Sequence, residues 1–230
     1  MAKKRVSRSR KRDLNEPDEF ISFWTKLFEL ISEYKLIFSS ALGVMVVVII
    51  VIMGIIYFTK KSEDKAFVLL QQGIINYQTE LKTNTPEKAY LDAEKDFQRI
   101  MDKYSNRYGS KLAVFFYANM CYTANNFDKA IELYKKSLIN FNDELFLKNL
   151  ILNGLGYSYK AKKDYKTAAQ YFEIIASDTD YKIKDEALFN LGELYAAMGD
   201  HDKSTSAFKK ILSDHSDSMY IEIIKERVTG

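Results

Sequence analysis

The sequence has 230 residues, of which 47% are hydrophobic and 28% are charged, and its formal net charge is +3. Seven Lys or Arg residues and no acid occupy the first twelve positions, whereas residues 60–230 hold 25 basic and 25 acidic residues. Because the bulk of the chain is neutral, nucleic-acid binding, which depends on neutralising phosphates, is disfavoured. A basic arm before an apolar segment is instead typical of a membrane-topology signal.

Residues 17–35 are predicted to form an amphipathic helix after the basic arm. Six large apolar side chains recur there at helical spacing: Phe20, Trp24, Leu27, Phe28, Ile31 and Tyr34. The other side of the helix is rich in acidic residues. Such a helix would suit either the cytoplasmic interface of a membrane or the helix of a partner, and both interpretations stay open.

A long apolar run follows this helix. No charged residue occurs between Leu36 and Phe58, and as a helix the run would be roughly 34 Å long, enough to cross about 30 Å of hydrocarbon. A core helix is usually shorter, and the large residues followed by charge at the end of the run differ from a signal-peptide cleavage site. We therefore predict a permanent transmembrane helix over 36–59. The greater density of Lys and Arg before it places residues 1–35 in the cytoplasm and residues 60–230 outside.

Two segments of the remaining chain match each other with a period of 36 residues. The shared motif is Leu-Gly, a Tyr three residues after the Gly, a polar turn, a small residue twelve after the Gly and an aromatic residue four further on. The two copies are Leu155, Gly156, Tyr159, Ala168 and Phe172, and Leu191, Gly192, Tyr195, Ser204 and Phe208. A third copy, displaced upstream by 38 residues, has Ala118, Cys121, Phe127, Ala130 and Tyr134 in the equivalent places.

This pattern resembles the tetratricopeptide repeat (TPR), whose unit of about 34 residues is a pair of antiparallel helices. The small residues mark where the two helices of a pair cross most closely, and the aromatic residues fill the gap to the next pair. The last copy departs from the family pattern, with His201 in place of the usual aromatic residue and Ser204 in place of the usual Ala.

The resemblance implies an all-α fold in which a stack of helical hairpins, a TPR α-solenoid, follows the single transmembrane helix. The TPR-like domain covers 60–230 and contains nine helices. Its predicted parts are a divergent hairpin at 62–104, repeats at about 111–140, 149–178 and 185–214, and a terminal helix at 217–228.

No motif for catalysis is present in the sequence. His201 and His215 are the only histidines, and each falls in a turn or helix end beside an Asp, where a solvated side chain is usual. Cys121 is the only cysteine and is predicted to pack inside a helix pair. Gly154 and Gly156 belong to a helix crossing and not to a phosphate-binding loop. We therefore expect no enzyme activity, no catalytic residue, no cofactor and no metal.

A TPR stack offers a concave surface lined by the first helix of each pair. The family's groove-facing positions, transferred to the three clearest copies, nominate eight residues for protein binding: Phe115, Asn119, Tyr122, Asn153, Tyr157, Lys160, Phe189 and Glu193. For each of them the alternative, simple packing against a neighbouring helix, stays open. The set mixes aromatic and polar side chains without the Lys and Arg cluster that would bind a terminal carboxylate. Extended or partly unfolded protein segments are therefore the expected ligands.

The layout from the basic arm to the last residue, and above all the stretch 96–138, is similar to the YfgM family of ancillary subunits of the SecYEG translocon. The resemblance implies a single-pass inner-membrane protein whose periplasmic TPR domain meets emerging, unfolded secretory polypeptides and periplasmic chaperones such as PpiD. The helix from Phe20 to Tyr34 departs from the family's short cytoplasmic tail. Two other classes stay open: a scaffold for envelope assembly, similar to the TPR partners of the Tol-Pal or outer-membrane assembly systems, and a tethered module that works in the cytoplasm with reversed topology.

Overall fold

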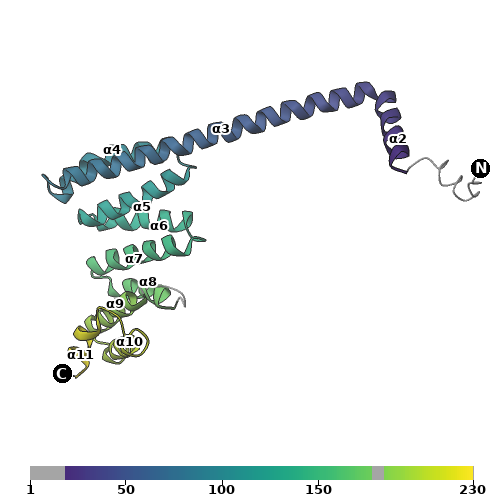
Figure 1. Ribbon diagram of the computed structural model, residues 1–230. Helices are drawn as coiled ribbons and strands as arrows, with labels where there is room; N and C mark the ends of the chain where they lie inside the picture. The colour runs from purple at the N-terminus through teal and green to yellow at the C-terminus, as the bar shows by residue number, and fades with distance from the viewer. Residues whose placement is uncertain (1–18, 178–183, 230) are drawn as a thin grey trace, which may run out of the picture. The chain divides into compact units, whose positions relative to one another are not determined.

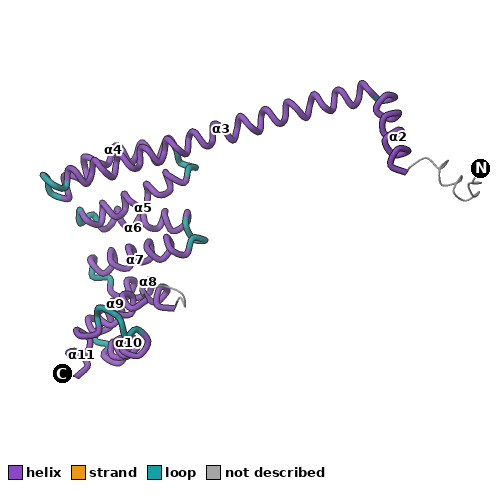
Figure 2. The backbone as a smooth tube through the Cα atoms, in the orientation of Figure 1, coloured by secondary structure: helices purple, strands orange, loops and turns teal. Residues whose placement is uncertain are grey.

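The computed structural model of the chain describes residues 19–177 and 184–229. Within these ranges all regular secondary structure is α-helical (Figure 2), which confirms the predicted all-α class. The helices are α2 (Glu19–Glu33), α3 (Lys35–Glu80), α4 (Pro86–Lys103), α5 (Tyr108–Thr123), α6 (Phe127–Asn140), α7 (Leu145–Ala161), α8 (Tyr165–Ser177), α9 (Lys184–Ala197), α10 (His201–Asp214) and α11 (Ile221–Thr229). The predicted basic arm lies outside the described residues.

The chain divides into two compact units, residues 1–59 and 60–230. In the first unit, α2 exposes large apolar side chains, among them Phe23, Trp24 and Phe28. A turn at Tyr34 separates α2 from α3. The apolar surface of α2 is therefore not used for packing within this unit.

The helix α3 contains the apolar run. Its most apolar 18-residue window has a mean hydropathy of 3.0, and none of that window is buried. By length and composition alone, α3 is the one helix among the described residues that could cross a membrane. Two hydroxyls within the run are satisfied locally, because Ser39 Oγ donates to the Leu36 carbonyl (3.1 Å) and Ser40 Oγ donates to the Ile37 carbonyl (2.9 Å).

The helix α3 continues well past the apolar run. The sequence predicts a transmembrane helix over 36–59 and a separate hairpin that begins at residue 62, but the structure has a single helix of 46 residues. No Gly, Pro or Asn lies between Phe58 and Phe67 to end a helix, and the Lys, Glu and Ala residues there favour one. The second part of α3 therefore serves as the first helix of the first hairpin.

Glu63 in α3 connects the first hairpin to the second. Its carboxylate accepts hydrogen bonds from the backbone N–H groups of Tyr108 (3.1 Å) and Gly109 (2.7 Å), at the start of α5. Arg107, the N-cap residue of α5, makes no side-chain cap. A side chain from another helix thus satisfies the free amides of this helix terminus.

The turns inside the three later hairpins share one conformation. The residue before the second helix's N-cap has a positive φ, at Asn125 (56°), Lys163 (62°) and Gly199 (79°). The next residue is Asn126, Asp164 or Asp200, whose side chain accepts the backbone N–H three residues later and whose own N–H bonds the carbonyl five residues earlier. This is a Schellman C-cap followed directly by an N-cap, and it reverses the chain within a few residues.

Glycines in the first helix of a hairpin lie against aromatic rings of the second helix. A Cβ atom on Gly156 would lie 2.7 Å from the Phe172 ring, and one on Gly192 would overlap the ring of Phe208. The same relationship in the first hairpin is looser, since a Cβ on Gly73 would lie 3.1 Å from Phe97. The small residues of the repeat motif therefore do mark the closest crossings.

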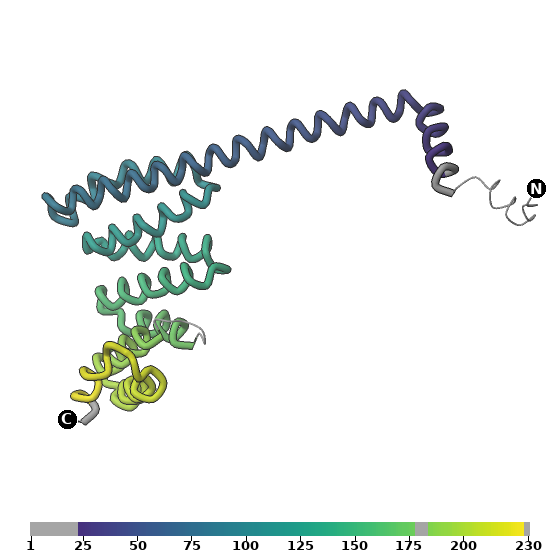
Figure 3. The backbone as a smooth tube through the Cα atoms, viewed as in Figure 1, coloured from purple at the N-terminus to yellow at the C-terminus, as the bar shows by residue number. Residues whose placement is uncertain are grey.

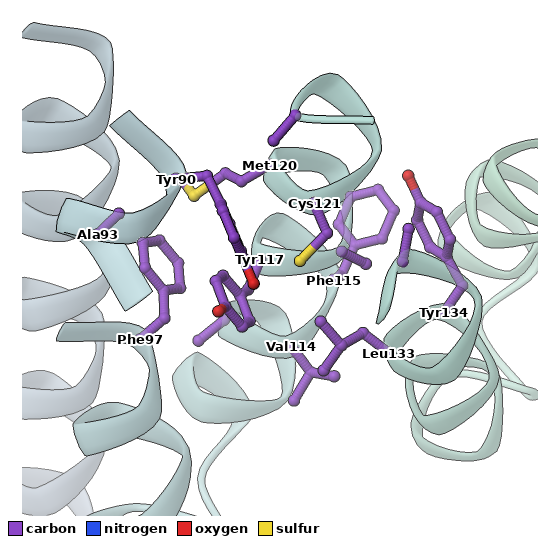
Figure 4. Close-up of a cluster of buried hydrophobic side chains, with 14 of the residues drawn as sticks. Tyr90, Ala93, Phe97, Val114, Phe115, Tyr117, Met120, Cys121, Leu133 and Tyr134 are labelled. Carbon is purple, nitrogen blue, oxygen red and sulfur yellow. The ribbon is translucent and has the colours of Figure 1, made fainter. Parts of the chain in front are cut away.

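Buried side chains run through the whole stack of hairpins. Figure 4 shows the part between α4, α5 and α6, where the ring of Tyr117 packs against those of both Tyr90 and Phe97. The ring centroids are 5.6 Å and 5.7 Å apart, and both pairs are stacked. Beyond α7 the core continues as a second cluster that extends to Ile224 of α11.

Successive hairpins pack in chain order within the second unit (Figures 1 and 3). The second helix of one hairpin contacts the first helix of the next, as in α4 with α5, α6 with α7 and α8 with α9. The last hairpin, α9 and α10, is followed by α11, which packs on α10. In the described residues of this unit, α3 to α11 supply nine helical segments, the arrangement expected of a TPR α-solenoid.

Candidate protein-interaction surface

The helices α5, α7 and α9 carry the eight residues nominated for protein binding. Each is the first helix of its hairpin, α5 contacts α7, and α7 reaches α9 through side-chain hydrogen bonds. These three helices therefore meet on one side of the stack, and we call this side the A-helix face.

Three of the nominated residues, Asn153, Tyr157 and Lys160, belong to one polar network between α7 and α9. Tyr157 Oη donates to Glu186 Oε1 (2.7 Å), and Asn153 Nδ2 donates to the same oxygen (3.3 Å). Asn190 Nδ2 donates to Tyr157 Oη (3.0 Å), while Asn190 Oδ1 accepts from Lys160 Nζ (2.9 Å). The network holds neighbouring hairpins together with groups that also lie on the A-helix face.

Partial burial changes the acid–base properties of this network. Burial, with the hydrogen bond to Glu186, raises the pKa of Tyr157 well above the ordinary tyrosine value. Burial lowers the pKa of Lys160. Asn153 Oδ1 is buried and has no hydrogen-bond partner within the described part of the chain.

The nominated residues of α5 lie around Tyr134 of α6. Phe115 is only 8% exposed, and its ring lies 6.3 Å from that of Tyr134. Asn119 Oδ1 accepts a hydrogen bond of 2.6 Å from Tyr134 Oη. Tyr122 is half-buried beside Phe127, and burial raises its pKa. Phe115 is thus mainly a core residue, whereas Asn119 and Tyr122 keep accessible surface.

The nominated residues of α9, Phe189 and Glu193, lie under the terminal segment. The Phe189 ring stacks on Tyr220 with centroids 4.3 Å apart and an interplanar angle of 13°. Arg227 of α11 forms an ion pair with Glu193 and lies 5.9 Å from the Phe189 ring. These two side chains therefore pack against the chain's own C-terminal part.

Four residues that contact the nominated set were not found by sequence reasoning: Glu186, Asn190, Tyr220 and Arg227. Asn190 is almost fully buried, and Glu186 lies one helical turn before it. A sequence signal does exist for these two, because 186, 190 and 193 form a polar stripe on a helix whose other positions are mostly apolar. Nothing comparable marks Tyr220 or Arg227.

The residues considered for chemistry are dispersed. His201 is the exposed first residue of α10, His215 follows the end of that helix, and Cys121 is fully buried in α5. Burial raises the pKa of the Cys121 thiol to about 12. Within residues 19–177 and 184–229, no group of three His, Cys, Asp or Glu side chains is placed to hold a metal ion.

Sequence comparison identifies the family of this chain. A model of the tetratricopeptide repeat-like domain matches residues 37–228. The chain belongs to this TPR-like family. No curated protein matches the chain in a sequence comparison.

The TPR-like match covers more than the stacked hairpins. It begins within the apolar part of α3 and ends in α11, so it includes the candidate span and the terminal helix. A TPR-like domain is a protein-interaction module, and protein partners in general follow from this membership.

Proposed function

We propose that the chain is a membrane-anchored TPR adaptor without enzyme activity. The apolar part of α3 anchors it in the inner membrane, the N-terminal arm lies in the cytoplasm, and the hairpins lie in the periplasm. There the A-helix face binds emerging polypeptides or a periplasmic chaperone beside the SecYEG translocon. This is the role implied by the resemblance to the YfgM family.

The chemistry of the A-helix face is the observation that carries this proposal. Lys160 is the only cation among the eight nominated residues, and its Nζ already donates to Asn190. A ligand with a terminal carboxylate would therefore find no cluster of open cations among these eight residues. Half-buried aromatic rings such as Tyr122 and Tyr157 suit apolar side chains of many sequences.

One amide on the same face supports binding of an extended backbone. The Oδ1 of Asn119 is used by Tyr134, which leaves its Nδ2 as a hydrogen-bond donor. Asn153 does not add an acceptor, because its Nδ2 is used by Glu186 and its Oδ1 is buried. Since an unfolded segment presents unpaired C=O groups, a donor beside aromatic rings fits such a ligand.

Site-specific photocrosslinking in cells tests the proposed partners. A crosslinking side chain at Tyr122 or Tyr157 is expected to capture translocon subunits or nascent secreted chains. The matched control is Gln170, which is exposed on α8, the second helix of its hairpin, and is expected to capture neither. Capture of outer-membrane assembly or cell-division proteins instead would favour the second candidate, a scaffold for envelope assembly similar to Tol-Pal partners.

A reporter fusion tests the proposed topology. A periplasm-specific enzyme fused after the last residue is expected to be active, and a cytoplasm-specific one inactive, because the basic arm precedes the apolar run. The opposite result would place the hairpins in the cytoplasm, as in the reversed topology.

A further inference from the structure

We propose that α2 lies in the surface of the lipid bilayer that the apolar part of α3 crosses, with its apolar side turned towards the acyl chains. This inference rests on the membrane span proposed above, but not on the direction of that span. It goes beyond the adaptor role, because it assigns a second interaction surface of the chain, and the partner of that surface is lipid.

The helix α2 has two sides of opposite character. At 3.6 residues per turn, Trp24, Phe28 and Ile31 fall on one side. Lys26 and Glu29 fall on the other side. Six large apolar side chains of this segment are exposed: Phe23, Trp24, Phe28, Leu30, Ile31 and Tyr34. A helix with one wide apolar side and one charged side is typical of a boundary between water and an apolar phase.

The covalent chain brings α2 to the membrane surface. The helix ends at Glu33, and the apolar run of α3 begins at Leu36, three residues later. The bonds at this junction are helical, so these two residues lie roughly 5 Å apart. The headgroup layer is roughly 5–8 Å thick on each side of the hydrocarbon. The end of α2 therefore lies within that layer if the apolar run spans the bilayer.

Tyr34 interrupts the helix at this junction. Its N–H donates to the Leu30 carbonyl (3.0 Å) as the last bond of α2, and its carbonyl accepts the N–H groups of Ile37 (2.9 Å) and Phe38 (3.0 Å) at the start of α3. Because a turn separates the two helices, α2 need not continue along the axis of α3. A straight continuation would carry the exposed apolar side chains into water, whereas a helix in the membrane surface buries them.

The charge of α2 shows which force would hold it there. The helix contains one Lys and three Glu, a net charge of −2, so anionic lipid does not attract it. Burial of apolar surface is left as the cause, and it acts equally on a zwitterionic bilayer. Trp24 and Tyr34 suit this position, because their amphipathic rings favour the depth of the headgroups.

The fluorescence of Trp24 tests the position of α2, because it is the only Trp in the chain. The full-length chain is placed in vesicles of phosphatidylcholine alone, so attraction of the basic arm to anionic lipid plays no part. Bromine atoms near the headgroup end of the acyl chains should quench Trp24 about twofold more than bromine atoms near the methyl end, because an interfacial helix inserts only roughly 5–10 Å. Strong quenching by aqueous acrylamide without quenching by either lipid would place α2 in water and overturn the proposal.

Moving the Trp tests the orientation of the helix. Phe28→Trp in a Trp24→Phe chain keeps the Trp on the apolar side and should retain the quenching by lipid. The matched control is Glu29→Trp in the same Trp24→Phe chain, which places it one residue further on the polar side. The control should be quenched at least about twofold less by brominated lipid and more by acrylamide. Equal lipid quenching at positions 28 and 29 would overturn the proposed orientation.

A second copy of the chain is the other occupant that this sample could supply. Copies that paired through α2 would shield Trp24 from lipid, so quenching would fall as the protein-to-lipid ratio rises. We expect quenching by lipid to stay constant over about a tenfold range of this ratio. A fall would assign the apolar side of α2 to pairing between copies and contradict lipid as its partner.

Failure of the span and failure of the surface position of α2 give different results. A chain that leaves the vesicles in alkaline carbonate contradicts both. A chain that stays with the vesicles while brominated lipid leaves Trp24 unquenched contradicts only the position of α2.

Discussion

Ser204 Oγ donates a hydrogen bond of 2.8 Å to the carbonyl oxygen of Gly192, twelve residues earlier. Both residues lie at the closest crossing of α9 and α10, where the repeat motif usually has an Ala in the second helix. Ser204 is almost fully buried, so its hydroxyl needs a partner within the hairpin. The hydrogen bond to the Gly192 carbonyl therefore compensates for burying a Ser hydroxyl where the family pattern has Ala.

Replacing Ser204 with Ala should lower the free energy of unfolding by about 1 kcal/mol, because one buried hydrogen bond is lost without a change in packing. The measurement is chemical denaturation of the full chain in detergent. Ala168→Ser is the matched control, since its hydroxyl would lie twelve residues after Gly156 and find an equivalent carbonyl. We expect Ala168→Ser to change the free energy of unfolding less than Ser204→Ala does. A larger loss for Ala168→Ser would show that the crossing of α7 and α8 differs from that of α9 and α10.

Gly192→Ala should be strongly destabilising, by about 1–3 kcal/mol, because the added Cβ would overlap the Phe208 ring. Gly73→Ala is the milder comparison: its Cβ would lie 3.1 Å from Phe97, and the better helix propensity of Ala, about 1 kcal/mol, offsets the tight contact. Thermal unfolding of both variants gives the comparison. An unfolding temperature for Gly192→Ala that is no lower than that of Gly73→Ala would contradict the close contact between α9 and α10.

Lys163→Gly should stabilise the chain by about 0.5–1 kcal/mol, since a side chain with a Cβ atom is strained at positive φ and Gly is not. Lys162→Gly, one residue earlier, should instead be destabilising because Lys162 has ordinary helical angles. Gly199→Ala should also be destabilising, as it places a Cβ at a φ of 79°. Unfolding midpoints of the three variants, measured under the same conditions, test whether each substitution raises or lowers the stability as predicted.

Tyr157→Phe should weaken the attachment of α9 to α7 and change the response to alkali. Below the ordinary tyrosine pKa of about 10 both the folded and the unfolded chain hold the proton, so the contribution of Tyr157 is fully present. Above that pH the unfolded chain ionises while the raised pKa keeps the folded residue neutral, so stability falls as pH rises. The variant should therefore release one proton fewer on unfolding above pH 10. An unchanged pH dependence of the unfolding midpoint would contradict this.

Cys121 should react with a thiol reagent at pH 8 at least a hundredfold more slowly in the folded chain than in denaturant. Its side chain is 0% exposed, and burial raises the pKa of the thiol to about 12, so little thiolate is present. Thr123→Cys in a Cys121→Ala chain is the control, because position 123 is exposed on the same helix and should react quickly. Fast labelling of Cys121 itself would mean that α5 opens readily.

The hairpins could be predicted from the sequence because their crossings depend on residue types at fixed spacing. The spacing between the small and the aromatic residue is sixteen in both copies, from Gly156 to Phe172 and from Gly192 to Phe208. A pairing of a small with a large side chain at a constant spacing can be recognised in the sequence alone. The continuity of α3 was missed, since the change from apolar to charged residues after Phe58 resembles the end of an element although no residue there ends a helix.

The contacts of the candidate surface were harder to predict than the helices. The bond between Tyr157 and Glu186 depends on how far α9 is rotated against α7, which many side chains decide together. The covering of Phe189 and Glu193 depends on where the last helix packs, and the family's groove positions carry no information about that.

The contacts of the C-terminal segment, Tyr220 and α11, have a consequence for how such a chain can gain repeats. Phe189 and Glu193 stand 36 residues after Asn153 and Tyr157, and the earlier pair contacts α9 as the later pair contacts Tyr220 and Arg227. The C-terminal segment thus occupies the place that the first helix of a further repeat would take. A further hairpin inserted by gene duplication before the C-terminal segment would have a compatible neighbour on both sides. The number of repeats can therefore change in evolution while the same C-terminal segment still covers the last hairpin.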